Sequence, residues 1–260
     1  MLRPPDPSVD VWRDNAGGVC AYAYSVNGRH CMDWPAIGRF CFDEPGDTVL
    51  AWAAPGVAAH AIERVHRRGV VPAALQRLGF ETLHASGVRL RAGVVGFLGH
   101  AGAGKSTLAR AFTAVAGVSP WADDTLIVAL DDDETAAVPI PFDVGLRPSS
   151  ARHFGEDASG VITATGGPAP LAALMMLERG SPSILATRLD ARDAFECVLP
   201  HACTFSMNDA DRRRQMVEHY LTLAAQVPVF RLAYPTDFGA LPEVVDVVAG
   251  AVSRQVGVAR

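Results

Sequence analysis

The pattern of apolar and polar positions changes once along the chain. Up to about residue 60, three short β-favouring runs, VCAYAYSV (19–26), GRFCFD (38–43) and TVLAWAA (48–54), are separated by Gly, Pro, Asn and Asp. Such runs between turn-forming residues are typical of a small, mostly antiparallel sheet. Residues 57–80 then carry apolar residues at helical spacing, and helical segments alternate with apolar strands from there onward.

This change predicts two parts, a small β-rich N-terminal lobe with a helical connection at 1–75 and an α/β core at 76–260. Within the core, residues 171–180 and 181–189 are predicted to form apolar strands or buried stretches. Residues 209–227 are predicted to form a helix near the surface, because an Asp-rich start precedes Arg, Met, Leu and Tyr at helical spacing. The acidic segment DDDE, Asp131 to Glu134, is interpreted as a solvated hairpin connection and not as a metal site.

Composition indicates a globular protein with enough apolar material for a packed core. Hydrophobic residues make up 49% of the chain and charged residues 20%, with a net charge of −5. The mildly acidic balance argues against nucleic acid as a partner, since binding to phosphate backbones requires a concentrated cationic face. Arg212 to Arg214 form the nearest approach to a basic block and are interpreted as part of a solvated helix.

Neither a membrane span nor an export signal is expected. No run reaches the roughly 18 apolar residues that a span requires, and MLRPPDPSVD at the start lacks the apolar core of a signal peptide. We therefore expect a cytoplasmic protein. The five cysteines, an odd number without CxxC spacing, suggest neither a disulfide framework nor a zinc site, and we predict buried or free thiols at these positions: Cys20, Cys31, Cys41, Cys197 and Cys203.

The segment with the clearest chemistry is VVGFLGHAGAGKSTLARAF, residues 94–112. It reads as an apolar strand, a glycine-rich turn and a helix with Leu108 and Phe112 four residues apart, and it fits the spacing G-x-x-x-x-G-K-[ST] in full. Backbone N–H groups of such a turn, with the first turn of the helix, can surround phosphate oxygens. Lys105 would then reach the terminal phosphates, and Ser106 would supply an oxygen to Mg²⁺.

The use of lysine supports this interpretation over a chance glycine-rich turn. Lys105 is the only lysine among 23 basic residues. A lone lysine suggests a position where a compact point charge on a flexible stem is required and the broad guanidinium fork of arginine does not fit.

An acidic pair and a histidine extend the candidate site. Asp123 and Asp124, in WADD, follow the helix of the loop and precede an apolar run. Two adjacent carboxylates can divide the work of binding Mg²⁺ and accepting the proton of an attacking hydroxyl, although a simple turn or helix cap is the alternative. His84, in LHASGV, precedes the strand that leads into the loop, whereas His100 inside the loop is interpreted as pointing to solvent.

Together, the segments LHASGV, GHAGAGKST and WADD resemble the catalytic core of HPr kinase/phosphorylase and of the HPr kinase-related proteins, which include the peptide kinases of lasso-peptide gene clusters. A late segment, 226–248, is similar to the same family, with Pro228, Arg231, Leu232 and Pro235 matching its pattern. The resemblance covers most of residues 70–250.

The resemblance implies an α/β fold with a phosphoenolpyruvate-carboxykinase-like P-loop core that uses ATP and Mg²⁺ to phosphorylate a serine hydroxyl. By position, Asp123 would be the general base, Asp124 would assist Ser106 at the metal, and His84 would stand near the γ-phosphate with Lys105. The triphosphate would be bound by Gly99, His100, Ala101, Gly102, Ala103, Gly104, Lys105, Ser106 and Thr107.

Departures from the family restrict the expected acceptor. The glycine-rich C-terminal signature of true HPr kinases is absent and the N-terminal lobe differs, so HPr is a poor candidate and reverse phosphorolysis is doubtful. We expect a hydroxyl acceptor on a peptide or protein. A small-molecule hydroxyl, a non-catalytic nucleotide switch and a plain NTPase are the alternatives. The choice between ATP and GTP stays open, as does the oligomeric state, with a homo-oligomer as one option.

Two arginines are candidates for a further phosphate contact. Arg147, in PFDVGLRPSS, is weighed equally against a packing or surface role. Arg231, in VFRLAYP, is interpreted either as a phosphate contact or as half of an ion pair that fixes the C-terminal region. The predicted helix at 209–227 is a further candidate to cap the acceptor site.

Overall fold

The chain folds around two main sheets, each with its own apolar core. The computed structural model describes residues 10–13, 16–43, 48–131, 134–155, 160–205 and 209–258. They divide into two units, formed by the described parts of Met1–Phe80 with Thr204–Met216 and of Glu81–Cys203 with Val217–Arg260. The sequence predicted a boundary after residue 75, whereas the first segment of the smaller unit continues to Phe80. Helices and sheets occur together, which confirms the mixed α/β class.

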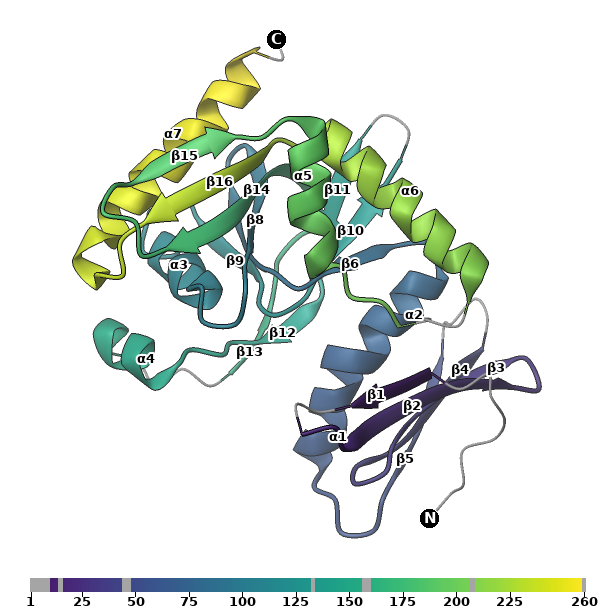
Figure 1. Cartoon of the computed structure of the whole chain (residues 1–260). Helices are drawn as coiled ribbons and strands as arrows, with labels where there is room; N and C mark the ends of the chain where they lie inside the picture. Colours follow the sequence, from purple (N-terminus) through teal and green to yellow (C-terminus); the bar gives the residue numbers. More distant parts are fainter. Residues whose placement is uncertain are drawn as a thin grey trace. The chain divides into compact units, whose positions relative to one another are not determined.

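The smaller unit contains a five-stranded antiparallel sheet in the order β1-β2-β3-β4-β5 (Figure 1). The three predicted runs are confirmed as β2, β4 and β5, whereas β1 and β3 carry polar residues among the apolar ones and were not predicted. The strands are β1 (Asp10–Arg13), β2 (Val19–Val26), β3 (Arg29–Trp34), β4 (Gly38–Asp43) and β5 (Val49–Ala53).

A helical segment covers one face of this sheet. It consists of α1 (Ala59–Val65), the π-helical turn η1 (His66–Val70) and α2 (Val71–Arg77), in agreement with the helical spacing of residues 57–80. Val70, Ala73 and Ala74 pack with Met32, Phe40 and Phe42 of the sheet. The approach is close at Gly69, where a Cβ atom would lie 2.8 Å from the Trp34 ring.

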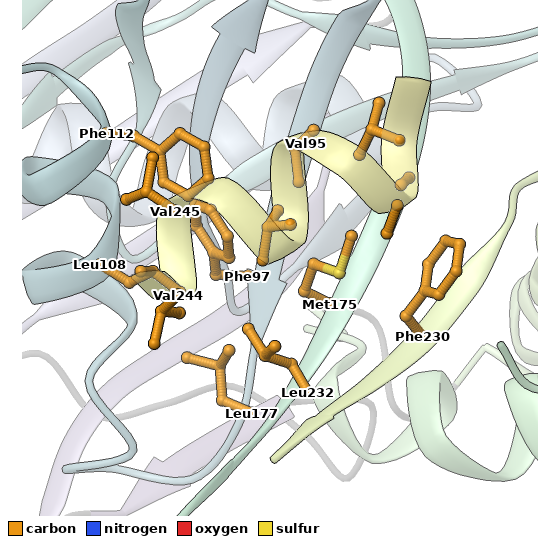
Figure 2. Packing of buried hydrophobic residues seen from close by; sticks show 14 of the residues in the cluster. Val95, Phe97, Leu108, Phe112, Met175, Leu177, Phe230, Leu232, Val244 and Val245 are labelled. Carbon is orange, nitrogen blue, oxygen red and sulfur yellow. The ribbon is translucent and has the colours of Figure 1, made fainter. Parts of the chain in front are cut away.

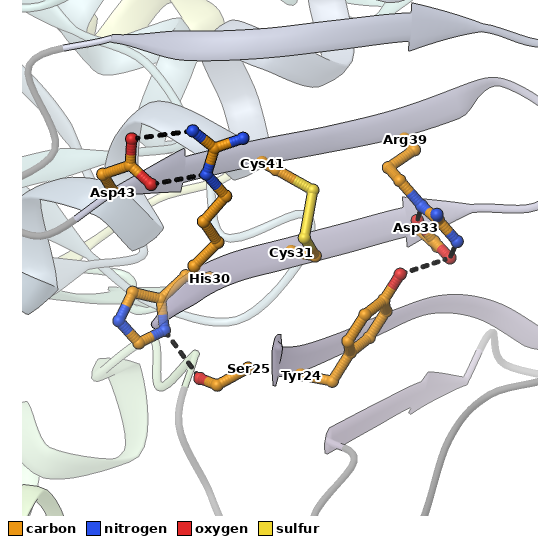
Figure 3. Close-up of a disulfide and its surroundings, with 9 residues drawn as sticks. Tyr24, Ser25, His30, Cys31, Asp33, Arg39, Cys41 and Asp43 are labelled. Carbon is orange, nitrogen blue, oxygen red and sulfur yellow. Dashed lines mark hydrogen bonds and ion pairs between the residues drawn. A yellow bond between two sulfur atoms is a disulfide. The ribbon is translucent and has the colours of Figure 1, made fainter. Parts of the chain in front are cut away.

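The opposite face of the sheet carries a disulfide, which corrects the prediction that all five cysteines are thiols. Cys31 on β3 lies directly opposite Cys41 on β4, and their sulfur atoms are bonded across a Cα–Cα distance of 4.2 Å (Figure 3). Strand register brought this pair together, and register is not visible in cysteine spacing. Cys20, Cys197 and Cys203 take no part in a disulfide.

The larger unit contains a nine-stranded sheet in which three central strands run parallel. The path is β6-β10-β11-β14-β8-β7-β9, with β16 pairing to both β14 and β15. β14 pairs in parallel with β8 and with β16, so the carboxyl ends of these strands lie at the same edge of the sheet. The strands are β6 (Glu81–Leu83), β7 (Ser86–Leu90), β8 (Gly93–Leu98), β9 (Ser119–Ala122), β10 (Leu126–Leu130), β11 (Thr135–Val138), β14 (Ala169–Arg179), β15 (Leu185–Arg188) and β16 (Val229–Tyr234).

Two helices pack against one face of the central strands. Leu108 and Phe112 of α3 (Lys105–Phe112) and Val244 of α7 (Leu241–Val258) contact the side chains that β8 and β14 direct to this face, as Figure 2 shows. Phe97 and Phe112 have ring centroids 5.5 Å apart. This packing holds the start of α3 at the end of β8.

The remaining elements complete the larger unit and its surface. Gln226 of α6 accepts a hydrogen bond from Thr135, and Tyr220 donates one to the carbonyl of Thr82. The elements are the two-stranded sheet of β12 (Pro141–Asp143) and β13 (Val161–Thr163), and the helices α4 (Pro148–Phe154), α5 (Ala191–Val198), η2 (Leu199–His201), α6 (Ala210–Gln226) and η3 (Phe238–Ala240). Of α6, only the part from Val217 onward belongs to the larger unit.

The remaining sequence predictions about secondary structure and membrane spans can be compared with the structure. The helix predicted at 209–227 is confirmed as α6. The apolar stretch at 171–180 overlaps β14, which begins earlier at Ala169, and the stretch at 181–189 contains β15. Asp132 and Asp133 of the acidic turn and residues 1–9 lie outside the described residues, although β10 and β11 on either side of the turn pair antiparallel. Among the described residues, no helix has both the length and the apolar composition needed to cross a membrane.

Replacing both Cys31 and Cys41 by Ser should destabilise the smaller unit. The bond closes a short loop in the unfolded chain, with a sequence separation of 10, so the free energy of unfolding should fall by about 2–3 kcal/mol. Urea denaturation with and without dithiothreitol measures this. The reductant should lower the stability of the wild type but not of the double variant, and thiol titration of the unreduced, denatured wild type should find the three free cysteines. Five titrated thiols would contradict the disulfide.

Candidate functional site

A glycine-rich loop, Gly99–Gly104, joins the buried strand β8 to helix α3. Gly99, Gly102 and Gly104 have φ angles of 147°, 91° and 100°, a region that other residues rarely adopt. At Gly104 a Cβ atom would also lie 2.6 Å from the hydroxyl of Tyr234. The loop therefore requires glycine for its backbone path, and it ends where the N–H groups of the first turn of α3 have no partners within the helix.

The side chain of Lys105 lies within this loop. Its ammonium group donates hydrogen bonds to the carbonyl oxygens of Gly99 at 2.7 Å and His100 at 3.4 Å, and the residue is 7% exposed. Burial lowers the pKa of Lys105 below its ordinary value. The negative charge of Asp123 opposes this lowering of the pKa, and the positive charge of Arg147 adds to it. A cation is thus enclosed by the loop with a carboxylate and a guanidinium nearby.

Asp123 is a buried carboxylate that joins three segments. Its Oδ1 accepts hydrogen bonds from the hydroxyls of Ser86 on β7, at 2.6 Å, and Ser106 on α3, at 2.7 Å. Its Oδ2 accepts from the backbone N–H of Gly145 at 2.9 Å. Both oxygens therefore have protein donors, and Asp123 is 8% exposed.

Asp124, the next residue, has a different environment. It lies between β9 and β10 with a positive φ of 62°, which is uncommon for a residue other than glycine. Its carbonyl oxygen is 3.1 Å from Nδ1 of His84. Because a carbonyl only accepts, this bond requires the proton on Nδ1 of the histidine and leaves Nε2 for another partner.

A cavity of about 300 Å³ opens above the loop. Both His84 and Asp124 line it, as do six of the nine loop and helix residues named from the sequence: Ala101, Gly102, Gly104, Lys105, Ser106 and Thr107. Gly99, His100 and Ala103 are not among its lining residues, and neither is Asp123, which reaches the cavity through Ser106. Residues of α6 do not line the cavity either.

The rest of the cavity wall comes from segments distant in sequence. Arg179 and Tyr234, at the carboxyl ends of the parallel strands β14 and β16, line it together with the turn Pro235–Phe238. Tyr234 donates a hydrogen bond to the carbonyl of Ala103, and burial raises the pKa of Tyr234 to about 12, so the phenol remains a donor at neutral pH. Ligands of open α/β sheets commonly bind at the carboxyl ends of the strands.

The two candidate arginines lie in different places. Arg147, which precedes α4, lines the cavity, with Nη1 3.2 Å from the position that a Cβ atom on Gly102 would occupy. Arg231 on β16 forms an exposed ion pair with Glu178, with Nε 3.0 Å from Oε1, and does not line the cavity. Of the two roles left open for Arg231, the ion pair is the one observed.

Sequence reasoning missed His201, which lies behind the loop. His201 is 5% exposed, its backbone carbonyl accepts from the N–H of His84 at 2.7 Å, and its Nε2 has no hydrogen-bond partner. Burial lowers the pKa of His201 to about 4, and the charges of Lys105, His100 and His84 contribute to this lowering. The His100 ring is exposed but lies 5.9 Å from that of His201. The segment LPHAC carries no spacing that could have indicated this cluster.

Ser106 and Asp124, the two metal ligands expected from the sequence, provide only part of a coordination shell. Among the described residues, no group of three or more His, Cys, Asp or Glu side chains is arranged to hold a metal ion. Mg²⁺ commonly binds through one or two protein oxygens together with substrate phosphates and water. A hydroxyl beside carboxylates is consistent with that kind of site.

Comparisons with known proteins give a likeness in structure but none in sequence. No family model matches the chain, and no curated protein sequence matches it. Among solved structures, the Hpr(Ser) kinase/phosphatase from Coxiella burnetii is similar with a TM-score of 0.39 and 13% sequence identity, over 67% of this chain and 97% of that chain. Interpretation of the site rests on its own geometry.

Replacing His201 by Gln should flatten the pH dependence of stability. The pKa of about 4 in the folded protein lies below the usual 6.5 of the unfolded chain, so stability is complete above pH 6.5 and falls as the pH drops toward 4. When the pH falls from 7 to 5, the effect of His201 should lower the free energy of unfolding by about 2 kcal/mol. Urea denaturation at pH 7 and at pH 5 should show a smaller difference in the free energy of unfolding for the variant than for the wild type. The exposed His60, replaced by Gln, is the matched control, and equal pH dependence in all three proteins would contradict the assignment.

Replacing Tyr234 by Phe should loosen the glycine-rich loop without disturbing the core. The ring remains in place, but the hydrogen bond to Ala103 is lost, at a cost of about 1 kcal/mol. Hydrogen exchange should become faster at the amides of residues 99–107 and remain unchanged in β14. Unchanged exchange in the loop would show that Tyr234 does not restrain it.

Proposed function

We propose that this chain is an ATP-dependent phosphotransferase of the HPr kinase-like P-loop type, which transfers the γ-phosphoryl group to a serine-type hydroxyl of a peptide or protein. The observation that supports this most is the convergence on one cavity of Lys105, Ser106 and Asp124, with Asp123 bonded to the Ser106 hydroxyl beneath it. A phosphate-binding loop, a metal-binding hydroxyl and two carboxylates are the parts that such a transfer requires.

The glycine-rich loop fits a triphosphate. Its positive-φ glycines allow the side chains of Arg147 and Tyr234 to approach the loop closely, since a Cβ atom on Gly102 or Gly104 would meet them. Backbone N–H groups of the loop and of the first turn of α3 would bind phosphate oxygens. On nucleotide binding, Lys105 would replace its hydrogen bonds to loop carbonyls by hydrogen bonds to phosphate oxygens. This role explains why a buried ammonium group lies at this position.

The donor set near Ser106 fits Mg²⁺. The hydroxyl of Ser106 and the carboxylate of Asp123 are hard oxygen donors, 2.7 Å apart. When bound, Mg²⁺ with ATP supplies charge neutralisation and the transferable phosphoryl group. Asp123 orients Ser106, while Lys105 neutralises developing negative charge.

We propose a division of labour between the two aspartates that reverses the expectation from sequence. Asp123 would help to hold Mg²⁺ together with Ser106, because its oxygens already accept hydrogen bonds from Ser86, Ser106 and Gly145. Asp124 would be the general base, because it lines the cavity into which an acceptor hydroxyl must enter. The bond between His84 and the Asp124 carbonyl would hold this turn in place.

The alternative functions differ in what occupies the cavity opposite the phosphates. A small-molecule hydroxyl would replace the peptide, water would replace it in a plain NTPase, and a non-catalytic switch would not need Asp124. We further propose that neither nucleic acid nor a membrane is a partner. The Cys31–Cys41 disulfide argues against the cytoplasmic location expected from the sequence, because such bonds are rare in reducing compartments.

Mass spectrometry of candidate peptide, protein and small-molecule acceptors incubated with Mg·ATP tests the proposal. The wild type should add about 80 Da to an acceptor, the mass of a phosphoryl group. Lys105→Ala and Asp124→Asn should each lower the transfer rate by about 10²–10³-fold. Asp124→Asn should retain Mg-dependent nucleotide binding, whereas Asp123→Asn should weaken it.

Asp246→Asn, which changes an exposed aspartate of α7 outside the cavity, is the matched control and should behave as the wild type. Release of free phosphate without a modified acceptor would favour the NTPase. Nucleotide binding without any transfer or hydrolysis would favour the switch. Full transfer activity in Lys105→Ala would show that the site has been assigned wrongly.

A further inference from the structure

Arg147 is an exposed arginine directed at the glycine-rich loop. Its Nη1 and Nη2 atoms lie 3.2 Å and 3.5 Å from the position of a Cβ atom on Gly102, inside the cavity that Lys105 and Ser106 also line. Across the part of the chain that the structure describes, no carboxylate forms an ion pair with its guanidinium group. Two cations, Lys105 and Arg147, therefore line the same small cavity.

The other arginines near the loop have partners. Arg179, the other arginine that lines the cavity, donates to the carbonyl of Thr236 at 2.9 Å, and Arg231, which lies outside the cavity, is paired with Glu178. Because Lys105 and Arg147 line the same cavity, their positive charges repel each other there. Such a repulsion is relieved when an anion enters between the two groups.

The segment that carries Arg147 is anchored on both sides. Two residues earlier, the N–H of Gly145 donates to Oδ2 of Asp123, the carboxylate that also binds Ser106. After Arg147, α4 begins at Pro148, and the carbonyl of Arg147 accepts the N–H of Ala151 at 2.9 Å. The backbone that carries Arg147 is thereby tied through one carboxylate to the serine at the start of α3.

We propose that Arg147 contacts the transferring phosphoryl group, and that the hydrogen bond between Gly145 and Asp123 positions it there. This inference rests on the proposed phosphotransfer. In that transfer, a bond forms between the acceptor oxygen and phosphorus, while the bond from phosphorus to the β-phosphate oxygen breaks and its electron pair leaves on ADP. The proton of the acceptor goes to Asp124. Negative charge on the equatorial oxygens faces Arg147 and Lys105 during this step, and a planar guanidinium can donate to two of these oxygens.

Binding of ADP with aluminium fluoride, which imitates the transferring group, tests this contact without turnover. Arg147→Ala should weaken binding of that complex by about 100-fold. Binding of a non-hydrolysable ATP analogue should be unchanged. Arg147→Lys should recover only a small part of the loss, because an ammonium group lacks the planar fork. The control Arg231→Ala removes an arginine outside the cavity and should match the wild type.

A matched pair at Gly145 tests the positioning step. Gly145→Pro removes the N–H that Asp123 accepts, whereas Gly145→Ala keeps it, and a Cβ atom there would lie 3.7 Å from Oδ2 of Asp123, an ordinary contact. Gly145→Pro should reproduce the loss seen in Arg147→Ala, and the double variant should be no worse than either single change. Gly145→Ala should bind both ligands as the wild type does.

The outcomes separate this inference from the proposed function. If the wild type binds both nucleotide complexes and Arg147→Ala weakens neither, or weakens both equally, Arg147 does not act on the transferring group and only this inference fails. Additive losses in the double variant would overturn the positioning role of Gly145. A wild type that binds neither complex would overturn both proposals. Selective weakening in Arg147→Ala without any transfer to an acceptor would support the contact and refute the kinase.

Discussion

The buried carboxylate of Asp123 is the constraint on which the site depends. A charged group removed from water is costly unless donors replace its hydration, and Asp123 is 8% exposed. Its donors come from β7, from the start of α3 and from the segment before α4. These three segments must therefore meet at one point, which sets the positions of the serine at the end of the glycine-rich loop and of the arginine opposite it.

Sheet topology explains why the cavity forms at this edge. β8, β14 and β16 run parallel, so their carboxyl ends lie at the same edge of the sheet. Arg179 and Tyr234, the last residues of β14 and β16, therefore line the cavity together with Lys105, which begins α3 after β8 and its loop. Packing of Leu108 and Phe112 against the sheet prevents α3 from shifting along β8. The loop is therefore supported by apolar packing on one side and by the phenol of Tyr234 on the other.

The electrostatics of the site oppose those of the whole chain. The chain has a net charge of −5, yet Lys105, Arg147 and Arg179 line the cavity at the glycine-rich loop. His201 remains neutral there because burial and the adjacent positive charge both disfavour its protonation. A local concentration of positive groups beside unpaired backbone N–H groups is the physical signature of an anion site.

Local physics made part of this protein predictable from its residues. Short β-favouring runs between turn residues predicted β2, β4 and β5, and helical spacing predicted α6. Glycines at fixed intervals before Lys105 predicted the strand, turn and helix of residues 93–112. Each of these signals acts over a few residues, within reach of one turn or one face of an element.

Contacts between segments far apart in the sequence could be known only from the folded structure. The register between β3 and β4 formed the Cys31–Cys41 bond, which spacing alone could not indicate. Parallel pairing brought Tyr234 to Ala103, and the chain path through η2 buried His201 behind the loop. Asp123 and Asp124 are adjacent and chemically identical, and only their surroundings distinguish a buried carboxylate with three donors from one that lines the cavity. Burial and hydrogen-bond partners are set by strand order and register, which no short run of residues encodes.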